Sequence, residues 1–110
     1  MTTITFVRNQ AGKIVHFVAE GHTAFAEAGS DIVCAAVSAL TLAAINGLTD
    51  VVGISVGYEV RDGYAECVLP DSLGSQEAYG AQVLLETLWV SLCDLAAQHS
   101  AFLSIQEQEV

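Results

Sequence analysis

The chain has 110 residues, of which 53% are hydrophobic and only 15% charged, a composition typical of one folded domain with a dense core rather than of a disordered segment. Thirteen acidic residues against three basic ones, Arg8, Lys13 and Arg61, give a formal net charge of −10. Because nucleic acids and anionic membrane surfaces are bound through clustered Lys and Arg, this charge argues against both and favours a basic partner.

Neither an export signal nor a membrane span is expected. The first seven residues lack the cationic start and the apolar stretch of a secretory signal. Of the two most apolar segments, residues 32–45 are too few to cross a bilayer, and residues 78–97 carry Glu86 and Asp94. The three cysteines are odd in number and have no Cys-x-x-Cys spacing, which fits free thiols in a reducing compartment. We therefore expect a soluble, cytoplasmic protein.

In the first part of the chain, alternating apolar and polar residues predict a strand over residues 3–7. A tight turn over 9–12 and a second strand over 13–20 follow, the latter rich in β-branched and aromatic residues. Residues 21–30 are small, bracketed by glycines and without strand or helix periodicity. This segment is predicted to be a loop with hinges at its ends.

A helix is predicted over residues 31–46, with Asp31 as its N-cap and Gly47 as its stop. The helix is apolar nearly all round, which indicates a buried element. Its polar exceptions, Ser38 and Thr41, follow Cys34 by one and two turns. The helical period therefore places Cys34, Ser38 and Thr41 on one face.

The second half of the chain repeats the strand, strand, helix order. Strands are predicted over 51–60 and 64–69, joined by a tight turn at 61–63, before a long helix over about 76–99 and a last strand over 102–106. The order ββαββαβ predicts a single domain over residues 1–110. The expected class is α/β or α+β, with two helices packed on a mixed sheet.

Metal chemistry is not expected. Three His and three Cys could supply ligands, but no two of them have the spacing of a zinc site. His16 lies within a predicted strand, and His99 lies at a helix end, where a cation complements the helix dipole. Both are interpreted as structural residues, and we expect no metal or other cofactor.

Cys34 has the setting of a nucleophile. It falls close to the predicted helix start, where unpaired N–H groups and the positive end of the dipole favour a thiolate. Its own N–H is also a candidate donor to an oxyanion. The competing interpretation is a small buried hydrophobe, since free cysteines are often buried. Cys67, in a strand, and Cys93, deep in a helix, lack the helix-start environment and are assigned to the core.

His22 precedes Cys34 by twelve residues, in the loop that leads into the same helix. Such a loop can fold back and bring the imidazole within hydrogen-bonding reach of the thiol, as a Cys-His pair requires. The alternative is an exposed loop histidine. Asp31 either caps the helix only or also orients the imidazole, and its charge opposes a thiolate unless a protonated His22 balances it. Ser38 either bonds near the sulfur or bonds back to its own helix.

The chain resembles the Prp family of bacterial ribosomal-processing cysteine proteases in three successive segments. These are Gly21-His22, the small-residue loop that follows, and residues 29–40, which include Asp-Ile-Val-Cys-Ala. The resemblance extends over the whole chain in length, element order and acidic character. It implies a homodimeric α/β enzyme that removes the short N-terminal extension of a basic large-subunit ribosomal protein, the twenty-seventh. It also implies Cys34 as nucleophile, His22 as general base, supporting roles for Asp31 and Ser38, and a mobile loop pivoting on Gly21.

Two other functions fit the residues. The chain could be a non-catalytic, acidic ribosome-assembly or interaction factor that binds a basic ribosomal protein, with Cys34 in the core and His22 incidental. It could also be a thiol-based redox sensor, which needs a second cysteine close to Cys34. The reactivity of the Cys34 thiol separates the enzyme from the assembly factor.

Overall fold

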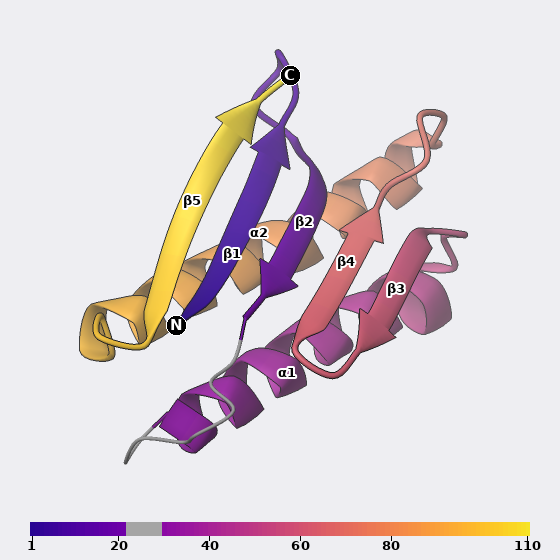
Figure 1. Ribbon diagram of the computed structural model, residues 1–110. Coiled ribbons are helices and arrows are strands. Elements are labelled where there is room, and N and C mark those ends of the chain that lie inside the picture. Colours follow the sequence, from indigo (N-terminus) through magenta and orange to yellow (C-terminus); the bar gives the residue numbers. More distant parts are fainter. Residues whose placement is uncertain (22–29) are drawn as a thin grey trace.

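The computed structural model describes residues 1–21 and 30–110, with the backbone alone for Ser30 and Asp31. Two helices, a short π-helical segment and five strands follow one another along this part of the chain (Figure 1). Their bounds are β1 Thr2–Arg8, β2 Ile14–Glu20, α1 Ser30–Asn46, η1 Gly47–Val52, β3 Gly57–Arg61, β4 Tyr64–Val68, α2 Ser75–Gln98 and β5 Leu103–Glu109. The predicted order of helices and strands is confirmed.

The five strands form one mixed sheet in the order β3-β4-β2-β1-β5. β1 pairs antiparallel with β2 and parallel with β5, and β4 joins β2 to β3 by antiparallel pairing. Both helices lie on the same face of this sheet and leave its other face uncovered (Figure 1). The expected α+β class, two helices on a mixed sheet, is therefore correct.

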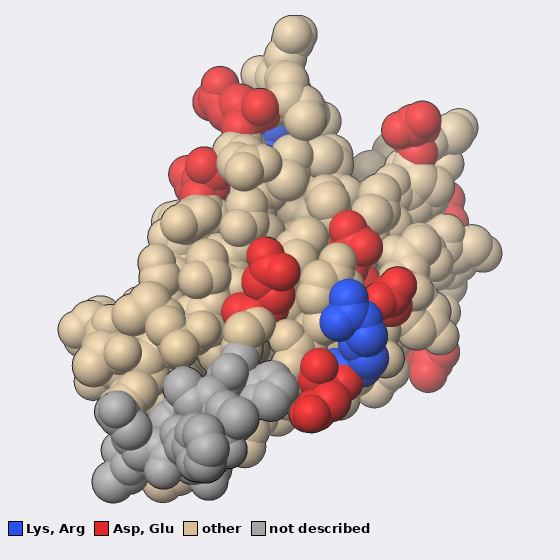
Figure 2. Space-filling model, viewed as in Figure 1, with Lys and Arg blue, Asp and Glu red and all other residues tan. Residues whose placement is uncertain are grey.

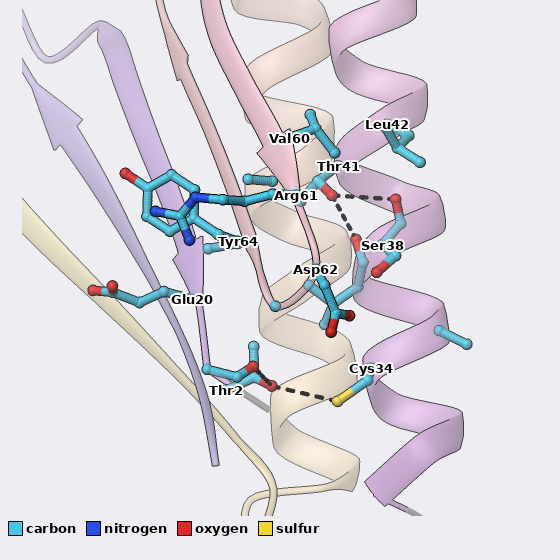
Figure 3. Close-up of a pocket in the computed structure, with 16 residues that line it drawn as sticks. Thr2, Glu20, Cys34, Ser38, Thr41, Leu42, Val60, Arg61, Asp62 and Tyr64 are labelled. Atoms are coloured by element: carbon cyan, nitrogen blue, oxygen red, sulfur yellow. Dashed lines mark hydrogen bonds between the residues drawn. The ribbon is translucent and has the colours of Figure 1, made fainter. Parts of the chain in front are cut away.

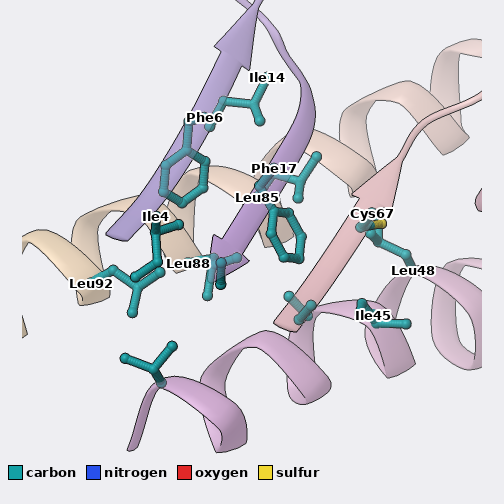
Figure 4. Close-up of a cluster of buried hydrophobic side chains, with 14 of the residues drawn as sticks. Ile4, Phe6, Ile14, Phe17, Ile45, Leu48, Cys67, Leu85, Leu88 and Leu92 are labelled. Carbon is teal, nitrogen blue, oxygen red and sulfur yellow. The ribbon is translucent and has the colours of Figure 1, made fainter. Parts of the chain in front are cut away.

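The core lies between the helices and the covered face of the sheet. In register, Phe6 pairs with Phe17 and Phe17 with Cys67, so these three side chains cross the sheet in one row. The two phenylalanine rings are 6.1 Å apart, and Leu85 and Leu88 of α2 pack with them (Figure 4). Period-two alternation in the strands and helical spacing of the leucines produce this layer, as the sequence pattern predicts.

The helical path does not stop at Gly47, contrary to the prediction. It continues through η1 and ends at Gly53, whose φ of +86° is the left-handed cap. Gly47 has a packing role instead, because a Cβ there would lie 2.9 Å from Leu84 Cδ1 of α2. Since residues 47–52 are helical, β3 starts only at Gly57, and the strand predicted over 51–60 is wrong in its first half.

The prediction that α1 is buried all round is also wrong. Val33, Val37 and Ile45 face the core, whereas Ile32 is 71% exposed and Leu42 is 41% exposed. The reason is architectural, because the two helices lie side by side on one sheet and no other described element packs on their outer surfaces. An apolar helix composition therefore indicates burial on only one side here.

With η1 added, the helical segment Ile32–Val52 is longer than predicted. By length and composition alone it could cross a membrane, and so could Ser75–Gln98. The core helices of soluble proteins pass the same test, so it is weak evidence for a membrane span. Both helices bury residues against the sheet, and packing accounts for the apolar residues on those inner faces.

Candidate active site

A pocket of about 210 Å³ opens between α1, the start of β1, the end of β2 and the β3–β4 turn (Figure 3). Its floor is small and apolar, with Ala19, Val37 and Ala65. Cys34 and Ser38 line one wall from α1, and the Arg61–Tyr64 turn forms the opposite rim. The pocket is thus built by segments distant in sequence, and it exposes a thiol and a hydroxyl on its helical wall.

The structure places Cys34 as the fifth residue of the described part of α1, partly exposed, with its sulfur in the pocket (Figure 3). Ser38 and Thr41 line the same pocket, which confirms the predicted common face. The Thr41 hydroxyl donates to the Val37 carbonyl at 2.9 Å and is buried in the helix. Ser38 is exposed, so it is the hydroxyl residue of α1 that faces the pocket opening.

Asp31 is not the N-cap. α1 already includes Ser30, so Asp31 lies in the first turn of the helix. In such a helix the N–H of Cys34 pairs with the carbonyl of Ser30, four residues earlier, and is not a free oxyanion donor. Both expectations depend on a helix that begins at residue 31, whereas the helix already includes Ser30. The side chain of Asp31 lies outside the described part of the structure, as does His22.

Gly21 lies at the rim of the pocket and directly precedes His22 in the sequence. Its φ is +101°, and a Cβ at this position would lie 2.5 Å from the Met1 carbonyl oxygen, so only glycine fits. The Gly21 N–H donates to the Gly63 carbonyl at 3.0 Å. Its carbonyl accepts from the Thr2 hydroxyl at 2.9 Å. Both backbone groups of Gly21 are therefore bonded, which makes it a fixed anchor; a pivot at Gly21 stays a prediction.

Thr2 also lines the pocket, and the sequence does not single it out. It is only 5% exposed, and its Oγ1 lies 3.7 Å from Cys34 Sγ as well as 2.9 Å from the Gly21 oxygen. A threonine at a core-facing position of a strand is a signal that sequence reasoning could have used, since a buried hydroxyl needs partners. What the sequence does not reveal is that those partners lie 19 and 32 residues away.

The other two cysteines differ from Cys34 and from each other. Cys67 is buried in the sheet, and burial raises the pKa of its thiol to about 11, in agreement with a core role. Cys93 is only half-buried, so its assignment to the core is wrong. Burial, followed by the nearby Glu107 and Asp94 carboxylates, raises the pKa of the Cys93 thiol. None of the three cysteines is in a disulfide.

The remaining histidines have structural positions. His16 Nε2 lies 2.8 Å from Glu66 Oε2 on the open face of the sheet. His99 is the C-cap residue of α2. Across residues 1–21 and 30–110, no three His, Cys, Asp or Glu side chains gather as a metal ion would require.

Acidic side chains surround the pocket rim. Glu20 and Asp62 line the pocket, and Glu59 lies on the neighbouring strand. The one basic residue there, Arg61, is bonded to Glu59 at 2.7 Å and stacks over the Tyr64 ring at 3.9 Å. Figure 2 shows the excess of red over blue on this side of the molecule. The rim therefore offers negative charge to an approaching ligand.

A sequence model of the family described as "Cysteine protease Prp" matches residues 1–104 of this chain. The chain belongs to the Prp family. The ribosomal processing cysteine protease Prp of Bacillus subtilis is 34% identical over 94 residues, which is 84% of each protein. Its namesake in Staphylococcus aureus is 27% identical over 105 residues, 91% of this chain and 92% of the relative. The protein is accordingly a cysteine protease.

Solved structures agree with the fold. The crystal structure of Prp from S. aureus in complex with a substrate peptide has a TM-score of 0.87 at 24% identity, covering 98% of this chain and all of that one. SMU.848 from Streptococcus mutans has a TM-score of 0.82 at 27% identity, covering 100% and 96%. Membership of the Prp family decides among the three functions considered from the sequence, in favour of the enzyme.

Proposed function

We propose that this Prp-family protease removes the short N-terminal extension of the twenty-seventh large-subunit ribosomal protein, with Cys34 as nucleophile and His22 as general base. The observation that carries the proposal is the position of the Cys34 sulfur, exposed in a pocket on α1. Gly21, the neighbour of His22 in sequence, is fixed at the rim of that pocket. The names of the relatives, ribosomal processing proteases, support the class of substrate.

In the proposed reaction, His22 accepts the proton of the Cys34 thiol as the sulfur attacks the carbonyl carbon of the scissile bond. The C–N bond then breaks, and the departing amine takes the proton back from His22. The acyl group, the N-terminal extension, remains on Cys34 as a thioester. Water, deprotonated by His22, hydrolyses the thioester and restores the thiol. A solved relative described as holding a covalently linked product peptide is consistent with such an intermediate.

The charge of the protein supports a basic substrate. The net charge is −10, and Glu20 and Asp62 line the pocket while Arg61 is already bonded to Glu59. Ribosomal proteins are basic, so long-range attraction increases their rate of encounter with this face. Cytoplasmic location, which the same substrate requires, is part of the proposal.

The proposal also includes a homodimer. One face of α1 exposes short or apolar side chains without a charge among them: Ile32, Ala35, Ala39, Leu42 and Ala43. Such a face lets two helices approach closely and suits a second copy of the same chain. Ala43→Glu is expected to convert the dimer to a monomer. Gln98→Glu adds the same charge on α2 and should leave the dimer intact. Light scattering measures the mass of both variants. A native protein that is monomeric at micromolar concentration contradicts this part of the proposal.

The cleavage itself is tested with the host's full-length ribosomal protein and intact-mass spectrometry. The native enzyme is expected to remove one defined N-terminal segment, and Cys34→Ala and His22→Ala to leave the substrate whole. Cleavage by Cys34→Ala would refute the assigned nucleophile, and cleavage at the native rate by His22→Ala would refute the assigned base. A substrate left intact by the native enzyme would contradict the proposed substrate.

A further inference from the structure

We infer that Thr2 is a positioning residue of this protease, whose single hydroxyl couples the Cys34 sulfur to the Gly21 carbonyl. The inference rests on the proposed function, in which Cys34 is the nucleophile. It concerns a residue outside the Cys, His, Asp and Ser positions that the family resemblance implies.

The backbone of Thr2 is rigidly held. Thr2 begins β1, its N–H donates to the Phe102 carbonyl at 2.9 Å, and it pairs with Leu103 in the parallel β1–β5 ladder. The side chain is almost fully buried and points toward α1 (Figure 3). Its Oγ1 therefore has a fixed place between two partners, the Gly21 oxygen at 2.9 Å and Cys34 Sγ at 3.7 Å.

The hydroxyl has one proton and two lone pairs, so it cannot donate to both partners at once. While it donates to the Gly21 carbonyl, it can only accept from the Cys34 S–H. Once the thiol has lost its proton, the sulfur can only accept, and the hydroxyl must turn its own proton toward the sulfur. The bond to Gly21 is then released. Loss of the thiol proton and release of the Gly21 carbonyl are thus linked through one hydroxyl.

The released carbonyl belongs to Gly21, which directly precedes His22 in the sequence. The other bond of Gly21, from its N–H to the Gly63 carbonyl, does not involve the hydroxyl and keeps the residue at the rim. Thr2 therefore restrains the carbonyl side of Gly21. This restraint relaxes at the step in which the sulfur becomes reactive.

No charged group facing the pocket from the described elements duplicates this donor. β2 contributes Glu20, and the β3–β4 turn contributes Asp62 and Arg61. Carboxylate oxygens accept hydrogen bonds, so these two side chains do not take the place of a hydroxyl donor to the sulfur. The Arg61 guanidinium bonds Glu59 and stacks on Tyr64, on the outer side of the turn. The Thr2 hydroxyl is a neutral donor that can reach the sulfur.

The test compares Thr2→Val, which keeps the shape but removes the hydroxyl, with Thr2→Ser, which restores it. Thr5→Val is the matched control, since it removes a hydroxyl from the same strand on the opposite face of the sheet. Two quantities are measured: kcat and KM for the ribosomal-protein substrate, and the pH dependence of Cys34 alkylation by iodoacetamide, mapped by peptide mass. In the second readout Cys67 is the internal control for folding, because its buried thiol is expected to be modified only when the chain unfolds.

Thr2→Val is expected to lower kcat about tenfold with KM within about twofold of native, because one hydrogen bond to the reacting sulfur is lost. Its half-maximal alkylation is expected at higher pH than in the native enzyme. Thr2→Ser should restore both quantities, and Thr5→Val should change neither. If Thr2→Val does not fold, Thr2→Ala is measured in the same way.

The inference is overturned if Thr2→Val alkylates and cleaves like the native enzyme. It is also overturned if Thr2→Ser is as slow as Thr2→Val, because the effect would then come from packing rather than from the hydroxyl. Cys34→Ala separates this failure from failure of the proposed function. An inactive Cys34→Ala beside a native-like Thr2→Val rejects only the role of Thr2, whereas an active Cys34→Ala rejects the nucleophile itself.

Discussion

Burial separates the cysteines of this protein at the scale of single residues. The Cys34 sulfur opens into the pocket, while Cys67 is 2% exposed, and burial raises the pKa of its thiol to about 11. A thiol reacts as the thiolate, and only when a reagent can reach it. The two thiols therefore differ in accessibility, and the elements that carry them set this difference.

Iodoacetamide at pH 8 is accordingly expected to modify Cys34 and to leave Cys67 unmodified in the folded protein. The pH of this experiment is about three units below the pKa of the Cys67 thiol, so about one Cys67 side chain in a thousand is a thiolate. Peptide mass mapping measures both sites. In denaturant Cys67 should react as well, which is the control for its accessibility. Equal modification of the two sites in the folded protein would contradict this assignment.

Gly21 and Gly12 give a matched pair for the anchor at the pocket rim. Both have positive φ, +101° and +80°, but a Cβ at Gly21 meets the Met1 carbonyl whereas one at Gly12 meets nothing within 4 Å. Gly12→Ala is therefore expected to cost about 1 kcal/mol of unfolding free energy, from backbone strain alone. Gly21→Ala is expected to cost about 3 kcal/mol and to reduce cleavage.

Urea unfolding followed by the fluorescence of Trp89, the single tryptophan, measures both glycine variants. Equal losses of stability in the two variants would show that the clash between a Cβ at residue 21 and the Met1 carbonyl does not destabilise the protein. A Gly21→Ala variant with native stability and native cleavage would contradict the claim that the site requires glycine at this position.

At the scale of elements, one arginine fastens three of them together. Arg8, at the end of β1, bonds Glu86 of α2 through both terminal nitrogens, at 2.6 and 3.0 Å, and Glu107 of β5 through Nε at 3.1 Å. Its guanidinium also lies 5.3 Å from the centre of the Trp89 ring. The hydrogen bond from Arg8 is the largest cause of a lowered pKa at Glu86. The ionised carboxylate is therefore favoured by folding.

Because the Glu86 pKa is lowered in the folded state, its contribution to stability is present above the ordinary value of 4.5 and is lost as the pH falls through the lowered pKa. Glu86 is partly exposed, so Glu86→Gln is expected to cost only about 1 kcal/mol at pH 7. The difference from native should vanish toward pH 3. Glu59→Gln, at an exposed pair, should differ little from native at either pH. A Glu86→Gln deficit that is equal at pH 3 and pH 7 would refute the assignment.

Local sequence patterns predict some helices and strands of this protein and fail for others. Strand alternation, the hairpin glycines and leucine spacing depend on neighbours within a few residues, and they predicted β1, β2, β4 and α2 closely. Gly47 was mistaken for a helix stop because its actual constraint is the Leu84 side chain of another helix. The valines at 51–52 favour strand by propensity, but the helical path from α1 through η1 overrides them.

In the site, too, features set by near neighbours in the sequence are predicted correctly, and features set by tertiary contacts are not. The shared face of Cys34, Ser38 and Thr41 follows from helical periodicity and is correct. The Asp31 cap and the free Cys34 N–H required a helix boundary accurate to one residue, which sequence patterns do not supply. The proximity of Thr2 and of the β3–β4 turn to Cys34 is not predictable from local patterns, because only tertiary folding brings these segments together.

Charge is the property that belongs to the whole molecule. The net charge is −10, acidic side chains outnumber basic ones on the face seen in Figure 2, and at the pocket rim Arg61 is paired with Glu59. For a basic substrate, this distribution increases the encounter rate more than it strengthens the bound complex. Electrostatic attraction of this kind weakens as salt shortens the screening length.

The value of kcat/KM for the full-length ribosomal protein is therefore expected to fall about fivefold when NaCl is raised from about 50 to about 500 mM. A short uncharged peptide that spans the cleavage site serves as the control and should respond much less. Equal salt responses of the two substrates would show that the acidic surface does not steer the substrate.

The most direct test of the central claim is to trap the acyl-enzyme. Native protein is mixed with the full-length ribosomal protein, quenched in acid during the first turnover and analysed by intact mass and peptide mapping. We predict a fraction of the enzyme heavier by the acylated N-terminal extension, with the added mass on Cys34 and absent from Cys34→Ala. Cleavage without any adduct on Cys34, or an adduct on another residue, would contradict the account.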